Sequence, residues 1–142
     1  MKKHSLQLIL LLVTLFFAGQ SEAGAQSFDN IANAIKGGNA SSLAASFGAN
    51  VEITIKDVGN SYSRNQGEMV LKNFFSTHHP KSFSIAHQGT SPEGSKYFIG
   101  KLSTSTGNYR AYVYSKTTNG KLVIQEIRFE DPRAWDAVRW SG

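Results

Sequence analysis

The 142-residue sequence contains no cysteine. Its absence excludes disulfide bonds, a thiol nucleophile, iron–sulfur clusters and cysteine-ligated zinc. It also excludes the lipid anchor of a lipoprotein, which is attached to a cysteine. The sequence has no internal repeat, low-complexity tract or linker between residues 26 and 131. It therefore predicts one domain that is stabilised by packing alone.

Clustered positive charge is missing as well. The net charge is +5, but beyond Lys2-Lys3 the basic residues stand singly along the chain. Proteins that bind nucleic acid usually gather this charge on one face. A dispersed excess is typical of a solvated surface, so the sequence predicts no nucleic-acid partner.

The first residues have the features of a signal peptide. Lys2-Lys3 form a basic head, residues 6–18 are almost entirely apolar, and Ala23-Gly-Ala25 fits the small-residue cleavage pattern. We predict a signal peptide over residues 1–25, a mature chain from Gln26, and export to the periplasm or beyond the cell without later membrane contact. A retained anchor is the alternative, but the run is too short for the ~30 Å bilayer core.

Helical periodicity appears in three places. Residues 27–36 and 40–47 are predicted as two short helices separated by a glycine pair. A longer third helix follows Ser63, which forms a capping box with Gln66, and it is stopped by Pro80. The apolar stripes of the first and third helices consist of Phe28, Ile31, Ala32, Ile35, Val70, Leu71, Phe74 and Phe75.

Alternating apolar residues predict six strands, four of them after the third helix. Asn119-Gly120 is a strong hairpin signal between the last two strands, and Gly107-Asn108 is predicted to separate the preceding pair. Helices first and an antiparallel meander last predict an α+β domain, with the helices on one face of the sheet. The predicted strands are residues 51–55, 61–62, 82–90, 96–104, 109–116 and 121–129.

Two irregularities indicate a strongly curved sheet. In the last strand the apolar residues change parity between Ile124 and Ile127, so either both faces are partly covered or a bulge lies near Gln125-Glu126. Gly100 stands in the middle of an apolar strand, where glycine often marks a bulge or bend. A curved sheet with helices across its hollow side forms a cone with a mouth.

Several motifs spread over residues 27–130 resemble a small family of exported bacterial proteins. They are Ala34-Ile-Lys-Gly-Gly-Asn-Ala40, Val51-Glu-Ile-Thr-Ile55, Pro80-Lys-Ser-Phe83, His87-Gln-Gly89, Tyr97-Phe-Ile-Gly100, Gly107-Asn-Tyr-Arg110 and Ile124-Gln-Glu-Ile-Arg-Phe-Glu130. The chain resembles domain-of-unknown-function family 4783, in the nuclear transport factor 2-like superfamily.

The resemblance implies a cone-shaped α+β fold in which a curved antiparallel sheet packs against three helices. It places the domain at residues 26–131 and leaves residues 132–142, with Trp135 and Trp140, as a C-terminal extension. Relatives in the superfamily include ketosteroid isomerase and members without chemistry. The family has no established activity, so the resemblance implies neither catalytic residues nor a cofactor.

His87 is the main candidate for a ligand site inside the cone. Alternation places it on the same face as Phe83 and Ile85, opposite Phe74 of the third helix, and imidazole titrates near neutral pH. The alternative is a histidine at the pocket rim that is hydrogen-bonded to the backbone. The pocket would take a small apolar ligand.

The predicted function is a non-enzymatic exported domain that binds a ligand or a protein. An isomerase or dehydratase centred on His87 is the alternative, and it would need an inward carboxylate that the sequence does not place there. An accessory subunit that works only in an assembly is a third possibility.

Two further groups have candidate roles. Arg110, Tyr112 and Tyr114 share the strand face opposite Ala111 and Val113, so they form either a homodimer interface or ordinary cross-strand packing. His78-His79 suggests a metal, but adjacent helical histidines point about 100° apart and rarely chelate one ion. We expect them to complement the helix dipole instead, and we expect no metal.

Overall fold

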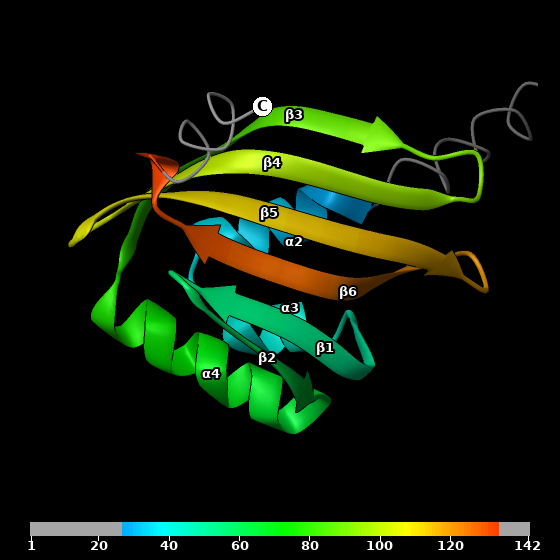
Figure 1. Cartoon of the computed structure of the whole chain (residues 1–142), viewed down its shortest axis with the longest axis horizontal. Helices are drawn as coiled ribbons and strands as arrows, with labels where there is room; N and C mark the ends of the chain where they lie inside the picture. Colours follow the sequence, from blue (N-terminus) through cyan, green and yellow to red (C-terminus); the bar gives the residue numbers. More distant parts are fainter. Residues whose placement is uncertain (1–26, 134–142) are drawn as a thin grey trace, which may run out of the picture.

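The computed structural model describes residues 27–133, in which helices cover one side of a curved sheet (Figure 1). The predicted signal peptide (residues 1–25) lies outside the described residues, as do Trp135 and Trp140 of the predicted extension. None of the helices in the described part of the chain is long and apolar enough to cross a membrane.

Helices and strands follow one another in the predicted order. The helices are α2 (Ser27–Lys36), α3 (Ala40–Ala44) and α4 (Arg64–Thr77). The strands are β1 (Phe47–Ile55), β2 (Val58–Ser63), β3 (Pro80–Thr90), β4 (Ser95–Thr104), β5 (Gly107–Thr118) and β6 (Lys121–Glu130). The α+β class predicted from the sequence is therefore confirmed.

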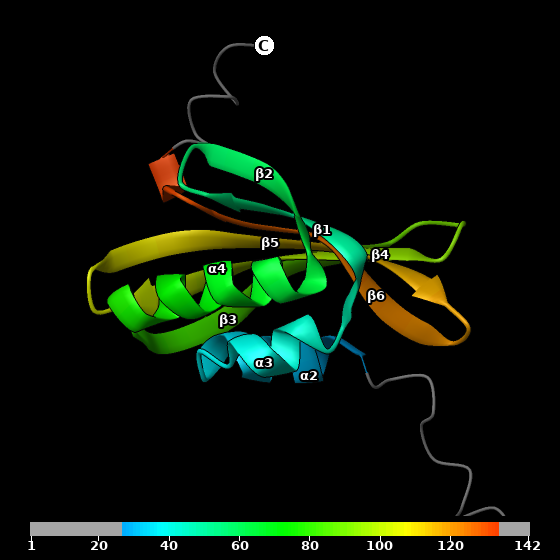
Figure 2. The ribbon, with the colours of Figure 1, turned by 90° about the horizontal axis from the view of Figure 1, so that it is seen from below.

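The six strands form one sheet in the order β2-β1-β6-β5-β4-β3. All neighbours are antiparallel except β1 and β6, which run parallel, with Ile53 opposite Ile127. The expectation of a wholly antiparallel sheet is thus wrong for this pair. The parallel pairing puts the last strand in the middle of the sheet. Figure 2 shows the helices together on one side of the strands.

One apolar core lies between the helices and the inner face of the sheet. Phe74 and Phe75 of α4 meet Phe129 of β6, and together with Leu71 of α4 and Phe98 of β4 they belong to one cluster, each at most 4% exposed. Burying a side chain of this size contributes roughly 1.5–3 kcal/mol. The apolar stripes predicted for α2 and α4 therefore supply much of the helical half of the core, and Leu43 of α3 adds to it.

Local sequence signals form the structures predicted from them. The Ser63 hydroxyl accepts a hydrogen bond from the Gln66 amide, and the Gln66 side chain accepts one from the Ser63 amide. This is the predicted capping box at the start of α4. Asn119 and Gly120 both have positive φ, 51° and 75°, as a type I′ hairpin turn requires.

Several bulges interrupt the strand pairing, and two of them bear on the sequence predictions. In β6 the pairing with β5 skips Gln125, so Ile124 and Ile127 both face the core, as the parity change predicted. In β3 the pairing with β4 skips Ala86. Gly100 itself is regularly paired with β5, but a Cβ there would lie 2.4 Å from the Phe83 ring. The irregularity expected at Gly100 therefore lies in the strand beside it.

Two boundaries differ from the prediction because hydrogen bonds compete with the local pattern. The helix predicted over residues 40–47 ends at Ala44, since the Ser46 carbonyl accepts from the Ile124 amide at 2.7 Å and Phe47 begins β1. The turn predicted at Gly107-Asn108 lies at residues 105–106. There the Thr104 hydroxyl donates to the Gly107 carbonyl at 2.8 Å and accepts from the Thr106 amide.

Candidate functional site

Aromatic rings fill the interior of the cone where a ligand pocket was predicted. Phe74 stacks on Phe129 with ring centroids 4.7 Å apart, and its edges meet Phe75 and Tyr109, each at 5.5 Å. Offset and edge-on pairs of this kind stabilise a core beyond the area they bury. Phe74 is thus a central core residue.

Phe83 and Ile85 are half-buried and belong to the rim of the same core. The Phe83 ring lies over Gly100 and edge-on to Phe98, with centroids 6.0 Å apart. Only glycine at position 100 leaves space for this ring. Ligand binding by Phe74, Phe83 and Ile85 stays a prediction, but in this structure their side chains pack into the core and its rim.

His87 is exposed, so the prediction that it faces the cone is wrong. The bulge at Ala86 adds one residue between Ile85 and His87 and thereby reverses the alternation. His87 pairs with Ile99, in a cross-strand row that continues through Tyr112. The isomerase or dehydratase alternative required this imidazole inside the cone, and that geometric premise is lost.

His78 ends α4 and contacts its own helix. Its Nδ1 lies 2.7 Å from the Thr77 hydroxyl and 3.0 Å from the Phe74 carbonyl, and its ring stacks on Phe74 at 4.5 Å. The His79 amide instead donates to the Ser105 hydroxyl. Within residues 27–133, no group of three histidine or carboxylate side chains is placed to hold a metal ion.

The outer face of the sheet is the side opposite α2, α3 and α4, and it displays a row of tyrosines. Ala111 and Val113 of β5 are fully buried while Tyr112 and Tyr114 are half-buried, so the tyrosines point outward as predicted. Tyr97 of β4, which is 40% exposed, lies beside Tyr112 with ring centroids 6.4 Å apart.

Charged residues of β6 border this row. The Arg128 guanidinium lies 6.0 Å from the centre of the Tyr112 ring, forms an ion pair with Glu126, and lies 3.5 Å from Glu130. Burial and the nearby Glu126 carboxylate both raise the pKa of Tyr112, and the hydrogen bond to Glu126 raises the pKa of Arg128. We call Tyr97, Ile99, Arg110, Tyr112, Tyr114, Glu126 and Arg128 the tyrosine face.

The sequence pattern identified three members of the tyrosine face and missed the rest. Tyr97 belongs to a run that is apolar on both sides, so alternation alone could not orient it. Its orientation follows from its pairing with Tyr114, and that of Arg128 from its pairing with Tyr112. A correct strand pairing was the missing signal.

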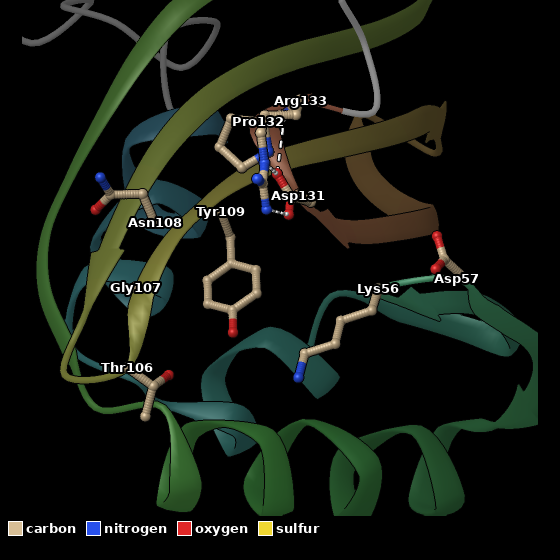
Figure 3. A pocket seen from close by; sticks show the side chains of 9 residues that line it. All are labelled: Lys56, Asp57, Thr106, Gly107, Asn108, Tyr109, Asp131, Pro132 and Arg133. Carbon is tan, nitrogen blue, oxygen red and sulfur yellow. Dashed lines mark hydrogen bonds and ion pairs between the residues drawn. The ribbon is translucent and has the colours of Figure 1, made fainter. Parts of the chain in front are cut away.

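A second candidate site is an open pocket of about 570 Å³ at the mouth of the cone. We call it the mouth pocket, and Figure 3 shows it from close by. Three chain segments meet there: the turn from β1 to β2, the turn from β4 to β5, and the chain that leaves β6. They meet because the parallel strands β1 and β6 end on the same side of the sheet, where the antiparallel strand β5 begins. Its lining residues are Lys56, Asp57, Thr106, Gly107, Asn108, Tyr109, Asp131, Pro132 and Arg133.

The mouth pocket was not predicted from the sequence. Lys56 and Tyr109 are far apart in the chain, and neither belongs to a recognisable motif. Their proximity follows from the parallel pairing of β1 with β6, which the sequence pattern did not indicate.

The layers, the strand order and the curved sheet define a protein of the nuclear transport factor 2-like fold class. A family model described as "Domain of unknown function (DUF4783)" matches residues 28–130. The chain belongs to the DUF4783 family. No curated protein sequence matches the chain.

Solved structures show the same fold. A DUF4783 family protein from Bacteroides uniformis is 30% identical, with a TM-score of 0.69 over 72% of this chain and 94% of that chain. One from Bacteroides fragilis is 29% identical, with a TM-score of 0.68 over 72% and 95%. An NTF-2-like protein of unknown function from Silicibacter pomeroyi is 10% identical, with a TM-score of 0.54 over 72% and 87%, and shares the fold alone.

Proposed function

We propose that this protein is an exported, non-enzymatic interaction domain that self-associates through the tyrosine face. The observation that carries the proposal is the composition of the outer face, where Tyr97, Tyr112 and Tyr114 lie on adjacent strands, on the side that none of the helices within residues 27–133 covers. Tyrosine and arginine are enriched at protein interfaces, because they bury large area and keep a polar end.

A second copy of this chain is the partner that the composition of the face favours. A two-fold axis brings the same patch of both copies together, so the tyrosines of one copy meet the tyrosines of the other. Arg128 is paired with Glu126 and Glu130 of its own copy, so these charges form a polar border around the aromatic contact.

Export is supported by the first 25 residues of the sequence. The basic head, the short apolar run and the small residues before Gln26 are the three parts of a signal peptide. An exported domain without disulfides gains stability by association, since binding to the folded state alone shifts the unfolding equilibrium. The lack of cysteine therefore favours a domain that self-associates.

Sedimentation velocity over a range of protein concentrations tests the proposal. We expect the wild-type protein to form dimers, and Tyr97→Glu and Tyr112→Glu each to shift the population to monomers, because an added carboxylate at the contact must be desolvated. Met69→Glu is the matched control, since Met69 is 56% exposed on α4, away from the tyrosine face. A wild-type protein that stays monomeric at high concentration contradicts the proposal, as does equal dissociation by Met69→Glu.

A further inference from the structure

We propose that the mouth pocket binds the carboxylate of a small organic acid through the ammonium of Lys56 and the hydroxyl of Tyr109. This site is separate from the tyrosine face and independent of self-association. Figure 3 shows the side chains of Lys56 and Tyr109 both directed toward α4, with their polar ends on the same side of the pocket.

Tyr109 supplies the first argument. It is 9% exposed, and its ring meets Phe74 at 5.5 Å and His78 at 5.4 Å, both edge-on. Its hydroxyl has no hydrogen-bond partner within the described residues 27–133. The ring is thus fixed by the core while the hydroxyl, which lines the open pocket, is free to donate a hydrogen bond to a ligand.

Lys56 supplies the second argument. Its φ is +58°, a left-handed conformation that side chains other than Gly, Asn or Asp seldom adopt. In the turn between β5 and β6, the residues with positive φ are Asn119 and Gly120, which adopt this conformation readily. The Lys56 amide donates to the Phe129 carbonyl at 2.7 Å, which fixes the turn against the end of β6. Backbone strain held in place by its surroundings is typical of functional positions.

Four charged residues line the pocket: Lys56, Asp57, Asp131 and Arg133. Arg133 donates to both carboxylate oxygens of Asp131, at 3.2 and 3.0 Å, and this bond holds the pKa of Asp131 below its usual value. The positive charge of Arg133 is therefore neutralised by Asp131. Asp57 turns away from the Tyr109 hydroxyl in Figure 3. Lys56 forms no ion pair with any residue in the described part of the chain.

The number of donors selects the ligand class. One ammonium and one hydroxyl match the two oxygens and the single negative charge of a carboxylate. A phosphate dianion has more acceptor oxygens and twice the charge, which this pair of donors leaves unsatisfied. The Pro132 ring borders the opening and offers an apolar contact to the body of the acid. A pocket of about 570 Å³ has space for a small organic acid.

Two-dimensional NMR titration of the protein expressed from the complete sequence tests the site, with benzoate as the probe. We expect benzoate to shift the amide signals of residues 56 and 106–109 in a saturable way. Benzyl alcohol, which lacks the charge, and inorganic phosphate should give no saturable shift. Lys56→Met and Tyr109→Phe should each raise the benzoate Kd about tenfold or more, the usual effect of one hydrogen bond to a charged group.

Control variants separate binding from folding. Lys101→Met removes a positive charge from the other face of the sheet and should leave the benzoate Kd unchanged. Lys56→Asn suits the left-handed backbone, so it keeps the turn and still removes the ammonium. Shifts that do not saturate or that map elsewhere would overturn the proposal. So would equal binding of benzyl alcohol or phosphate, or an unchanged Kd in Lys56→Asn.

Discussion

Truncation of Phe74 to alanine measures how firmly the interior of the cone is packed. Phe74 is 3% exposed and its ring meets the rings of Phe75, His78, Tyr109 and Phe129. Removal of a buried phenylalanine costs about 3–5 kcal/mol, through the transfer energy of the ring and the cavity left behind. Because other rings surround this side chain, we expect the free energy of unfolding to fall by about 4 kcal/mol. A domain has about 5–15 kcal/mol in total.

Urea unfolding followed by circular dichroism provides the measurement. With an m-value of about 1–2 kcal/mol/M, this loss lowers the midpoint by roughly 2–4 M. The m-value itself should not change, because the surface exposed on unfolding is nearly the same. A double-mutant cycle with Phe129→Ala should show a coupling of about 0.5–1.5 kcal/mol for the stacked pair.

Phe28→Ala is the matched control for this experiment. Phe28 is half-buried on α2, and its ring meets the Phe98 ring edge-on, with centroids 5.1 Å apart. We expect a loss of about 2 kcal/mol, within the usual range for a partly buried site. If Phe74→Ala loses no more than Phe28→Ala, the rings around Phe74 do not form the packed interior described above, and an open cone becomes the better description.

Two other predictions concern the ends of elements and of the chain. Ser63→Ala removes the cap of α4 and should lower the free energy of unfolding by about 1 kcal/mol in the same urea assay; no loss would mean that the Ser63 hydroxyl does not stabilise the helix. Export should remove residues 1–25, so the intact mass of the secreted protein should correspond to a chain that begins at Gln26. A secreted protein that retains those residues would contradict the signal-peptide prediction.

The sequence predicted those features that depend on neighbours along the chain. The capping box at Ser63, the Asn119-Gly120 turn and the bulge at Gln125 each leave a signal within a few residues. The bulge at Ala86 left no such signal, because Phe83, Ile85 and His87 occupy every second position, as residues on one face of a regular strand do. It arises where the Phe83 ring takes the space above Gly100 in the adjacent strand. His87 was therefore assigned to the wrong face.

The candidate sites could likewise be predicted only where their residues lie close together in the sequence. Tyr112 and Tyr114 could be assigned to the outer face, since they alternate with small residues within one strand. Lys56 and Tyr109 could not be brought together from the sequence, because their proximity depends on the parallel pairing of β1 with β6. That pairing joins distant segments through backbone hydrogen bonds, which leave little trace in side-chain patterns.

The central place of β6 determines when this protein can fold. β6 is the last strand of the chain, yet it separates β1 and β2 from the other strands. Until residues 121–130 are available, β1 lacks its inner neighbour and the core lacks Ile124, Ile127 and Phe129. Closing so long a loop is slow, since the chain must give up conformational entropy before the two strands can pair. An incomplete chain on the ribosome therefore cannot close its sheet, and folding follows synthesis of the whole domain.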